Sequence, residues 1–136
     1  MKAFITGITG MVGSHLAEFL LEETDWEIHG LIRWRSPLDN IENLIPNINK
    51  KDRVFLHYGD LRDSQSLDLA VENVKPDYTF HLAAQSYPKT SFEAPLDTYA
   101  TNISGTSSLL EALKKYSPDS IIHVCASSEV FGRVPK

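Results

Sequence analysis

The sequence has little that would mark a secreted, membrane-spanning or low-complexity protein. Cys125 is its single cysteine, which excludes an intrachain disulfide and makes a reducing cytoplasm the simplest expected setting. No apolar run approaches the roughly 18 residues that a membrane-spanning helix requires. Gly7 interrupts the apolar N-terminus before the core of a signal peptide can form. Seven glycines and seven prolines are too few for a low-complexity chain.

Positive charge is also in short supply. The chain carries 13 Lys and Arg against 18 Asp and Glu, which gives a net charge of −5. Because nucleic-acid binding depends on basic clusters that neutralise phosphates, we expect no nucleic-acid partner. The lack of a long apolar run likewise predicts no membrane partner. The chain is 136 residues long and 42% hydrophobic, which indicates about one globular domain.

Short apolar runs alternate with helical segments along the whole chain. The apolar runs predict five strands, over residues 2–6, 26–32, 53–58, 77–82 and 120–125. Three helices are predicted between them, over residues 11–23, from an N-cap at Asp63 to a stop at Pro76, and over residues 95–116. Residues 33–51 are polar and irregular, and Pro46 limits any helix there to a short piece.

The composition of these elements indicates a sheet that is covered on both faces. The strands are largely apolar on both sides, which is typical of parallel sheets between layers of helices. We therefore predict a Rossmann-type doubly wound parallel sheet in three α/β/α layers, truncated after the fifth strand. Apolar residues also share one face of each predicted helix: Val12, Leu16, Phe19 and Leu20; Leu67, Ala70, Val71 and Val74; and Leu96, Tyr99, Ile103, Leu110 and Leu113.

Three glycines lie in the turn between the first strand and the first helix. Gly7 suits a tight turn, Gly10 allows the backbone to approach a pyrophosphate, and Gly13 allows the helix to pack close to the strand. The start of the helix adds free N–H groups and the positive end of its dipole. Three glycines spaced G-x-x-G-x-x-G can simply form a turn, but the strand–turn–helix context favours dinucleotide binding. The predicted site also includes the intervening residues Thr9, Met11 and Val12.

The end of the second strand carries the residues expected to contact the ribose. An NAD site usually has Asp or Glu there, which bonds the 2′-hydroxyl. This chain has Arg33 and Arg35 instead, and two guanidinium groups suit the 2′-phosphate of NADP. A plainer interpretation makes both arginines solvated loop charges, and NAD stays the alternative cofactor. Trp34 between them can stack on the adenine or anchor the loop.

Several motifs together resemble the extended short-chain dehydrogenase/reductase superfamily, also described as the NAD-dependent epimerase/dehydratase family. They are the glycine turn, Asp60-Leu61, the run from His81 to Ser86, and the run from Asn102 to Thr106. Within this superfamily, the chain is most similar to the GDP-mannose 4,6-dehydratase type, through residues 33–36, 84–93 and 126–132. The resemblance covers the whole chain, but only the N-terminal part of a typical member.

The resemblance implies which residues would contact the cofactor. Asp60 and Leu61 would hold the adenine. Leu82, Ala83 and Ala84 would lie along the nicotinamide ribose. Gln85 would line the junction between the cofactor and the sugar, where Ser86 would contact the substrate. Asn102 matches a helix asparagine that helps to order the active site, although such a residue can also simply bond the backbone of its own helix.

The resemblance also implies a catalytic pair near the C-terminal end. Ser127 matches the residue that bonds the sugar 4-hydroxyl, and Glu129 matches the glutamate that removes the C5 proton. Ser128 between them would contact the substrate. Oxidation of C4 acidifies the C5 proton, so a carboxylate can act as a base and assist loss of the C6 hydroxyl as water. A plainer interpretation has the serines satisfying backbone groups and Glu129 solvated in a loop.

One departure from the family pattern is the absence of Tyr-x-x-x-Lys, the pair on which its hydride step relies. In relatives this pair and the substrate-binding part lie downstream. We therefore expect residues 1–136 to form one NADP-binding domain, the inactive N-terminal fragment of a cytoplasmic lyase of nucleotide-sugar metabolism. The expected partners are a nucleotide sugar, in particular a GDP-sugar, and further copies of the protein in a homo-oligomer.

Two other functions stay open. One is a nucleotide-sugar epimerase or 4-keto reductase of the same superfamily, because related reductases also carry Glu at the position of Glu129. The other is a non-catalytic NADP-binding module, in which the fold persists without the chemistry. The histidines show no metal-ligand spacing, so we expect no metal.

Overall fold

The fold is built on a single parallel sheet. The computed structural model describes residues 1–132, apart from the side chains of Ser128 and Glu129. Five strands pair in the order β3-β2-β1-β4-β5. Their bounds are β1 (Lys2–Thr6), β2 (Glu27–Ile32), β3 (Val54–Tyr58), β4 (Tyr78–His81) and β5 (Ile121–Val124). The predicted doubly wound parallel sheet is confirmed, and no predicted strand end differs from the structure by more than one residue.

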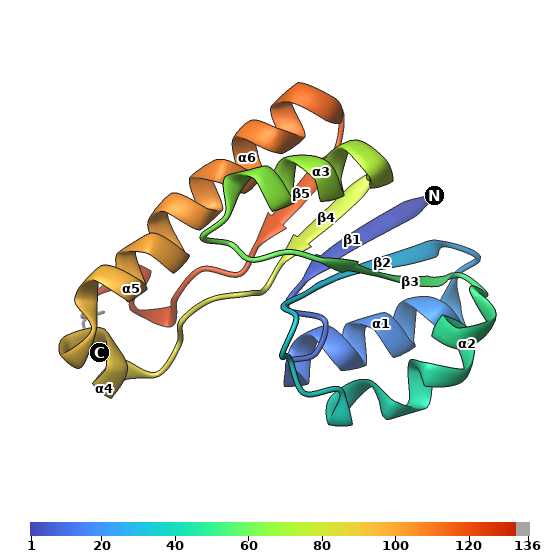
Figure 1. Ribbon diagram of the computed structural model, residues 1–136, viewed down its shortest axis with the longest axis horizontal. Helices are drawn as coiled ribbons and strands as arrows, with labels where there is room; N and C mark the ends of the chain where they lie inside the picture. Colours follow the sequence, from blue (N-terminus) through green and yellow to red (C-terminus); the bar gives the residue numbers. More distant parts are fainter. Residues whose placement is uncertain (133–136) are drawn as a thin grey trace.

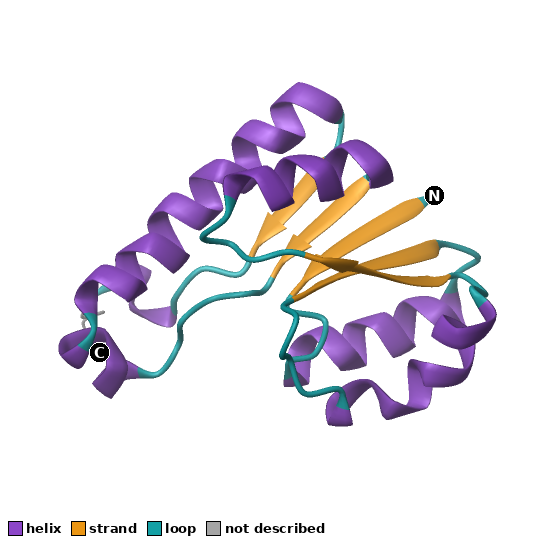
Figure 2. Cartoon of the chain, in the orientation of Figure 1, coloured by secondary structure: helices purple, strands orange, loops and turns teal. Residues whose placement is uncertain are grey.

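Helices cover both faces of this sheet, so the molecule has three layers (Figures 1 and 2). One face carries α1 (Met11–Glu23), η1 (Asp39–Leu44) and α2 (Ile45–Lys50). The other carries α3 (Ser64–Val74) and α6 (Gly105–Tyr116). Two short helices, α4 (Pro88–Glu93) and α5 (Pro95–Tyr99), lie beyond the ends of the strands, and the π-helical segment η2 (Ala100–Ser104) joins α5 to α6. A short helix, η3 (Ser128–Phe131), follows β5.

Alternating side chains of β1 reach the two hydrophobic cores on either side of the sheet. Ala3 and Ile5 belong to the core under α1, whereas Phe4 belongs to the core under α3 and α6, and all three are fully buried. On α3 the predicted apolar face is confirmed. Leu67 and Val71 are fully buried, and Ala70 and Val74 are nearly so. Asp63 caps this helix as predicted, because its carboxylate accepts hydrogen bonds from the N–H groups of the first turn.

The apolar face predicted for α1 is only partly the buried one. Val12 and Phe19 are 56% and 58% exposed. Leu20 is buried as predicted, and Leu16 is partly buried against the core under α1. The other buried residues of this helix are Gly13, Ser14 and Ala17. At Gly13 the helix lies so close to the glycine turn that an added Cβ would be 2.2 Å from Gly7 O. The face of α1 that meets the sheet therefore combines this close backbone approach with Leu16 and Leu20, and it leaves Val12 and Phe19 outside.

The helix predicted over residues 95–116 is present, but η2 interrupts it. Its i→i+5 turn shifts the helical register, so an apolar stripe that begins in α5 does not continue onto the same face of α6. The structure accordingly exposes Leu96, Tyr99 and Ile103, and it buries Leu109 and Leu113 against α3. The stripe as predicted is therefore wrong, and only its last member, Leu113, lies in the core.

The segment over residues 33–51 is more ordered than predicted. Pro46 lies in the first turn of α2, where its missing N–H group is not needed, and so it starts the short helix. Ile41 and Leu44 of η1 are buried in the core under α1. Helix α4 was not predicted at all, and Pro88 likewise begins it. Within residues 1–132, no helix combines the length and the apolarity needed to cross a membrane.

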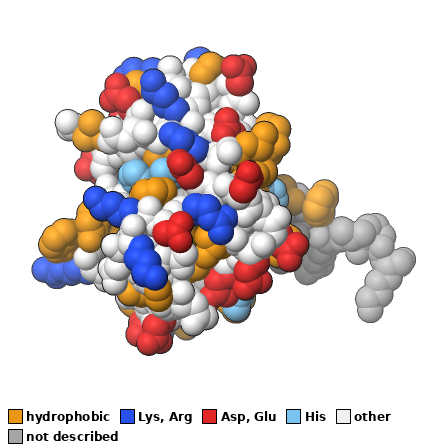
Figure 3. Space-filling view, turned by 90° about the vertical axis from the view of Figure 1, so that its right-hand side faces the viewer, with side chains coloured by type: hydrophobic (Ala, Val, Ile, Leu, Met, Phe, Trp, Pro, Cys, Tyr) orange, Lys and Arg blue, Asp and Glu red, His pale blue; other side chains and the backbone are white. Residues whose placement is uncertain are grey.

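Charges of both signs mix on the face shown in Figure 3, which lies at the end of the molecule where the strands begin. Lys and Arg side chains alternate there with Asp and Glu. Among the described residues, this face shows no large gathering of positive charge. This agrees with the acidic net charge of −5.

Candidate functional site

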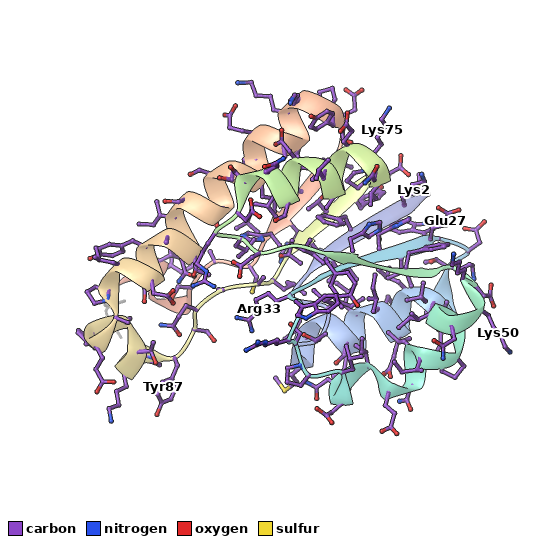
Figure 4. All side chains as sticks on the ribbon, viewed as in Figure 1. Lys2, Glu27, Arg33, Lys50, Lys75 and Tyr87 are labelled. Atoms are coloured by element: carbon purple, nitrogen blue, oxygen red, sulfur yellow. The ribbon has the colours of Figure 1, made fainter. Side chains whose placement is uncertain are left out.

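A cavity of about 620 Å³ opens at the carboxyl ends of the strands. Figure 4 shows Arg33 and Tyr87 at this end of the sheet, with Lys2, Glu27 and Lys75 at the opposite end. Most of the predicted site residues line the cavity: Gly7, Thr9, Gly10, Met11, Val12, Gly13, Arg33, Asp60, Leu61, Leu82, Ala83, Ala84, Gln85 and Ser86. Sequence reasoning did not assign a site role to seven further lining residues: Leu31, Ser36, Gly59, Arg62, Tyr87, Asp97 and Thr101.

The glycine turn forms one wall, and each glycine meets a different constraint. Gly7 has a φ of +79°, and a Cβ on it would lie 2.9 Å from the backbone N of Ala83. A Cβ on Gly13 would lie 2.2 Å from the carbonyl oxygen of Gly7, so only glycine allows this helix packing. A Cβ on Gly10 would meet the same oxygen at 3.2 Å, which is tight but possible. Gly10 is therefore the least constrained of the three by the protein itself.

The first turn of α1 points its N–H groups toward the cavity. Gly10 is the N-cap, and no side chain of the described residues caps this helix. The backbone N–H of Gly10 donates to Gly7 O at 2.9 Å, which closes the turn. Met11, Val12 and Gly13 follow and line the cavity. A helix start of this kind attracts anions through its free N–H groups and its dipole.

Arg33 and Ser36, which follow β2, both line the cavity. They form a turn in which Arg33 N–H donates to Ser36 Oγ at 3.2 Å and Ser36 N–H donates to Arg33 O at 3.0 Å. Arg35 is not among the residues that line the cavity. Trp34 is 79% exposed and its ring lies 5.0 Å from that of Tyr58, which favours the loop-anchor interpretation.

Asp60 follows β3, the strand beside β2, and Arg62 holds its carboxylate. Oδ1 accepts hydrogen bonds from Arg62 N at 2.9 Å and Arg62 Nε at 3.1 Å, and Oδ2 accepts one from Arg62 Nη2 at 3.0 Å. These bonds lower the pKa of Asp60 and raise that of Arg62. Arg62 Nη1 also donates to Asp97 of α5 at 2.7 Å. The cavity wall therefore contains an ionised carboxylate in a fixed orientation.

The loop after β4 is held in place by Asn102 of η2. Asn102 Oδ1 accepts from the backbone N–H of Gln85 at 2.8 Å, and Asn102 Nδ2 donates to Gln85 O at 2.9 Å. The Gln85 side chain in turn accepts from Tyr87 N–H at 2.7 Å. This loop carries Ala83, Ala84 and Ser86, so its conformation determines one wall of the cavity.

A buried histidine connects the glycine turn to the same loop. His81 Nδ1 lies 2.8 Å from Thr6 Oγ1, and His81 Nε2 lies 2.9 Å from Thr106 Oγ1. The Thr106 hydroxyl donates to Asn102 O at 2.7 Å, so it must accept from Nε2–H of His81. Thr6 Oγ1 then donates to Nδ1 and accepts from Ala83 N–H at 3.2 Å. Burial lowers the pKa of His81, which suits this neutral ring.

The predicted catalytic residues follow β5. Ser127 follows β5 and is not among the residues that line the cavity, and its carbonyl oxygen accepts from Val130 N–H at 3.1 Å. The side chains of Ser128 and Glu129 lie outside the described part of the structure. In residues 1–132, no group of three or more His, Cys, Asp or Glu residues is arranged to hold a metal ion.

The comparisons with known proteins agree on a family. The family model described as "GDP-mannose 4,6 dehydratase" matches residues 4–136. The chain belongs to this family. It is 41% identical over 138 residues to GDP-mannose 4,6 dehydratase of Drosophila melanogaster and 42% identical over 142 residues to GDP-mannose 4,6 dehydratase 1 of Arabidopsis thaliana. These alignments cover 97% and 98% of this chain but only 35% and 39% of those proteins.

Solved structures resemble this member of the GDP-mannose 4,6 dehydratase family in the same region. A UDP-glucose 4-epimerase of Thermus thermophilus, solved as a complex with NAD, is 30% identical and aligns with a TM-score of 0.72. The alignment covers 85% of this chain and 34% of the epimerase. The chain therefore corresponds to little more than a third of these relatives, and it contains the glycine turn and the cavity described above.

Proposed function

We propose that this chain is the cofactor-binding part of an NADP-dependent nucleotide-sugar 4,6-dehydratase, a lyase whose substrate is a GDP-sugar of the GDP-mannose type. The observation that carries the proposal is the position of the cavity in a chain of this family. The strand order β3-β2-β1-β4-β5 reverses direction between β1 and β4. Doubly wound sheets bind ligands at this point, outside the carboxyl ends of the strands.

The residues of the cavity fit the phosphates of a dinucleotide. The glycine turn lines the cavity with backbone at Gly7, Gly10 and Gly13, and the first-turn N–H groups of α1 would supply donors for a pyrophosphate. Arg33 would bind the 2′-phosphate of NADP, and Ser36 lies beside it as a second donor. Arg35 would add long-range attraction from outside the cavity. The coarser assignment, a nicotinamide dinucleotide, also draws support from the epimerase that was solved with NAD.

The remaining lining residues suit the other parts of the ligand. Asp60 and Leu61 would contact the adenine, and Leu82, Ala83 and Ala84 offer apolar surface and backbone to the nicotinamide ribose. Gln85 and Ser86 would lie where the sugar approaches. Asn102 would maintain this arrangement through its two hydrogen bonds to Gln85. We infer from the oligomeric habit of the superfamily that the whole protein is a homo-oligomer.

The proposed reaction assigns two roles to residues of this chain after β5. When bound, NADP supplies a hydride acceptor for C4 of the sugar and returns the hydride to C6. Ser127 would bond the 4-hydroxyl and hold it in position. Glu129 would take the proton from C5 and pass it to the C6 hydroxyl, which leaves as water. The proton of the 4-hydroxyl would go to the tyrosine of the Tyr-x-x-x-Lys pair in the longer protein, and C5 would take up one proton when the hydride returns to C6, so protons and electrons balance. This assignment rests on the family match over residues 4–136.

The cofactor assignment is tested by calorimetric titration of this chain with NADP⁺ and NAD⁺ at low and moderate salt. We expect NADP⁺ to bind more tightly and its binding to weaken with salt, because an ionic contact to the 2′-phosphate is screened. Arg33→Ala should lower the ratio of the affinities for NADP⁺ and NAD⁺ by about tenfold or more, since a charge-assisted hydrogen bond contributes roughly 1.5–3 kcal/mol. Arg35→Ala is the matched control and should have a smaller effect. Tighter NAD⁺ binding would contradict the assignment of NADP.

The catalytic assignment needs a longer form of the protein that includes a Tyr-x-x-x-Lys pair. In that form, Glu129→Gln should lower formation of the 4-keto sugar by about 10²–10⁴-fold, because the base is lost. Binding of NADP⁺ should stay the same. Glu111→Gln is the control, because Glu111 is a 73% exposed residue of α6 that pairs only with Lys114 among the contacts of the described structure. Full activity of Glu129→Gln would show that another group removes the C5 proton.

An epimerase is the second candidate, and the structural similarity to UDP-glucose 4-epimerase favours it. An epimerase inverts C4 and releases no water, and it does not need Glu129. The longer protein therefore distinguishes the two by its product. A 4-keto-6-deoxy sugar supports the dehydratase, a C4 epimer supports the epimerase, and net consumption of NADPH supports a reductase.

A further inference from the structure

Arg62 connects two walls of the cavity, and the proposed function leaves it without a role. It lies in the turn after β3, and its guanidinium reaches Asp60 in the same turn and Asp97 on α5. All three residues line the cavity. We propose that Arg62 determines specificity for the base of the cofactor, because it orients Asp60 so that the carboxylate offers one acceptor to an amino group. The inference rests on the proposed binding of a dinucleotide.

The hydrogen bonds leave a single position on the Asp60 carboxylate. Each carboxylate oxygen has two lone pairs that can accept a hydrogen. Both positions of Oδ1 are used, one by Arg62 N–H and one by Arg62 Nε–H. Oδ2 accepts only from Arg62 Nη2 among the contacts of the described residues, so it has one position left. Asp60 is 30% exposed at its side chain, so a ligand can reach it.

Asp97 fixes the far end of the guanidinium. Without it, the Arg62 guanidinium would be held only at Asp60 and could turn about its long stem. The Asp60 carboxylate would keep its bond from the Arg62 backbone N–H, but the direction of Oδ2 would no longer be fixed from both sides. The bond from Arg62 Nη1 to Asp97 Oδ1 is 2.7 Å, and Asp97 belongs to the first turn of α5, whose backbone is held by its helix. The three side chains are 30–48% exposed, so we expect this bridge to add little to the free energy of unfolding. The bridge instead fixes the direction in which Asp60 Oδ2 can accept a hydrogen bond from a ligand.

An acceptor in this fixed direction distinguishes bases by their 6-substituent. The 6-amino group of adenine donates a hydrogen bond, whereas the 6-oxo group of hypoxanthine or guanine is an acceptor. A carboxylate that faces a 6-oxo oxygen would leave both groups without a partner, which costs more than losing one hydrogen bond. Asp60 in its observed orientation therefore selects an amino-bearing base. Arg62 also keeps this carboxylate ionised, because its hydrogen bonds lower the pKa of Asp60.

The experiment measures base selectivity rather than affinity alone. Binding of NADP⁺, of NAD⁺ and of the hypoxanthine analogue of NADP⁺, nicotinamide hypoxanthine dinucleotide phosphate, is measured by calorimetry for the unchanged chain, Arg62→Met and Asp97→Asn. We expect the unchanged chain to prefer NADP⁺ by about tenfold or more. Arg62→Met should lower this preference several-fold, because Asp60 keeps only its bond from the backbone N–H of residue 62, and Asp97→Asn should produce an intermediate ratio. The urea midpoint of both variants should stay near that of the unchanged chain.

Lys115→Met is the matched control. Lys115 forms an ion pair of similar exposure with Asp68, at 3.0 Å and away from the cavity, so its removal should leave the ratio unchanged. If Arg62→Met unfolds, Asp97→Asn tests the same bridge, because it keeps the shape of the side chain.

Three outcomes would overturn the inference. If the variants still bind NADP⁺ and the ratio of their affinities for NADP⁺ and the hypoxanthine analogue is unchanged, this inference is overturned and the proposed function stands. A fall in the NADP⁺/NAD⁺ ratio without a change in base selectivity would make Arg62 a phosphate contact instead. Failure of the unchanged, folded chain to bind either nucleotide would overturn the proposed function, and this inference with it.

Discussion

The side-chain amide of Asn102 and the backbone of Gln85 exchange two hydrogen bonds, at 2.8 and 2.9 Å. The pair has the geometry of one rung of a sheet, in which a side chain replaces the neighbouring strand. Beyond the end of β4 the chain has no strand partner, so its backbone groups need another source of hydrogen bonds. Asn102 supplies them from the π-helical segment η2, and the loop that lines the cavity takes a defined path.

We expect Asn102→Ala to lower the free energy of unfolding by about 1–3 kcal/mol, because two half-buried backbone groups lose their partner. NADP⁺ should also bind more weakly, since the loop from Ala83 to Ser86 would no longer be held. Urea unfolding and calorimetry measure the two effects. Asn43→Ala is the control, because Asn43 makes one exposed hydrogen bond to Glu18. Equal behaviour of the two variants would show that the Asn102 pair does not order the loop.

Gly10 and Gly13 should respond differently to the same added methyl group. In Gly13→Ala the Cβ would lie 2.2 Å from Gly7 O, and the backbone atoms there cannot move aside, so we expect a loss of about 3 kcal/mol of folding stability. In Gly10→Ala the contact is 3.2 Å and the backbone has φ −81° and ψ 166°, which any residue adopts. This variant should stay within about 1 kcal/mol of the unchanged chain.

Ligand binding separates the two glycine variants further. A methyl group on Gly10 stands where the backbone would approach the pyrophosphate, so Gly10→Ala should fold and fail to bind NADP⁺. Thermal unfolding and calorimetry on the same samples provide the comparison. If Gly10→Ala bound NADP⁺ as tightly as the unchanged chain, the glycine turn would not be the phosphate site.

The elements that sequence reasoning located well are those with local signals. Gly7 and Gly59 mark the ends of strands, and Asp63 and Pro76 bracket α3, because each acts on the backbone beside it. The strand before the glycine turn and the helix after it were predicted from local sequence patterns in the same way. The glycine turn and the residues that follow β2, β3 and β4 line the cavity as a group, since parallel strands bring their carboxyl ends to one edge.

The features that the sequence did not reveal depend on contacts between distant segments. Arg62 and Asp97 are 35 positions apart, and nothing beside Asp97 indicates that it faces the turn after β3. The η2 segment shifts the face of the long helix, and no local residue pattern predicted a π turn. Side-chain positions that depend on strand register, such as the pairing of His29 with His57, could be found only once β2 and β3 were aligned.

That histidine pair should make the protein less stable in mild acid. His29 Nδ1 lies 3.0 Å from His57 Nε2. Burial, followed by repulsion from His57, lowers the pKa of His29 from 6.5 to about 4, although Glu27 opposes the shift. Burial lowers the pKa of His57 as well. The unfolded chain therefore binds more protons than the folded one, so the stabilising effect is complete above pH 6.5 and is lost as the pH falls toward 4.

Urea unfolding at pH 7.5 and pH 5 measures this dependence. The contribution of His29 is at most about 3 kcal/mol over the whole range, from the size of its shift. His57→Gln should reduce the loss at pH 5, because the repulsion disappears and glutamine can still bond His29. His15→Gln is the control, since the His15 side chain is 77% exposed. Unchanged pH dependence in His57→Gln would assign the acid sensitivity to other groups.

Thr106 offers a test of the hydrogen-bond chain through His81. Thr106→Val keeps the shape of the side chain but removes the hydroxyl, which leaves Nε2–H of the buried His81 without its partner. We expect a loss of about 1–3 kcal/mol in the free energy of unfolding, measured with urea. Thr106→Ser keeps the hydroxyl and should recover most of this loss. Nitrogen NMR of the ring should also show His81 protonated at Nε2 in the unchanged chain and in Thr106→Ser. A ring protonated at Nδ1 instead would contradict this series of hydrogen bonds, because the Thr106 hydroxyl has only one hydrogen, which it donates to Asn102 O.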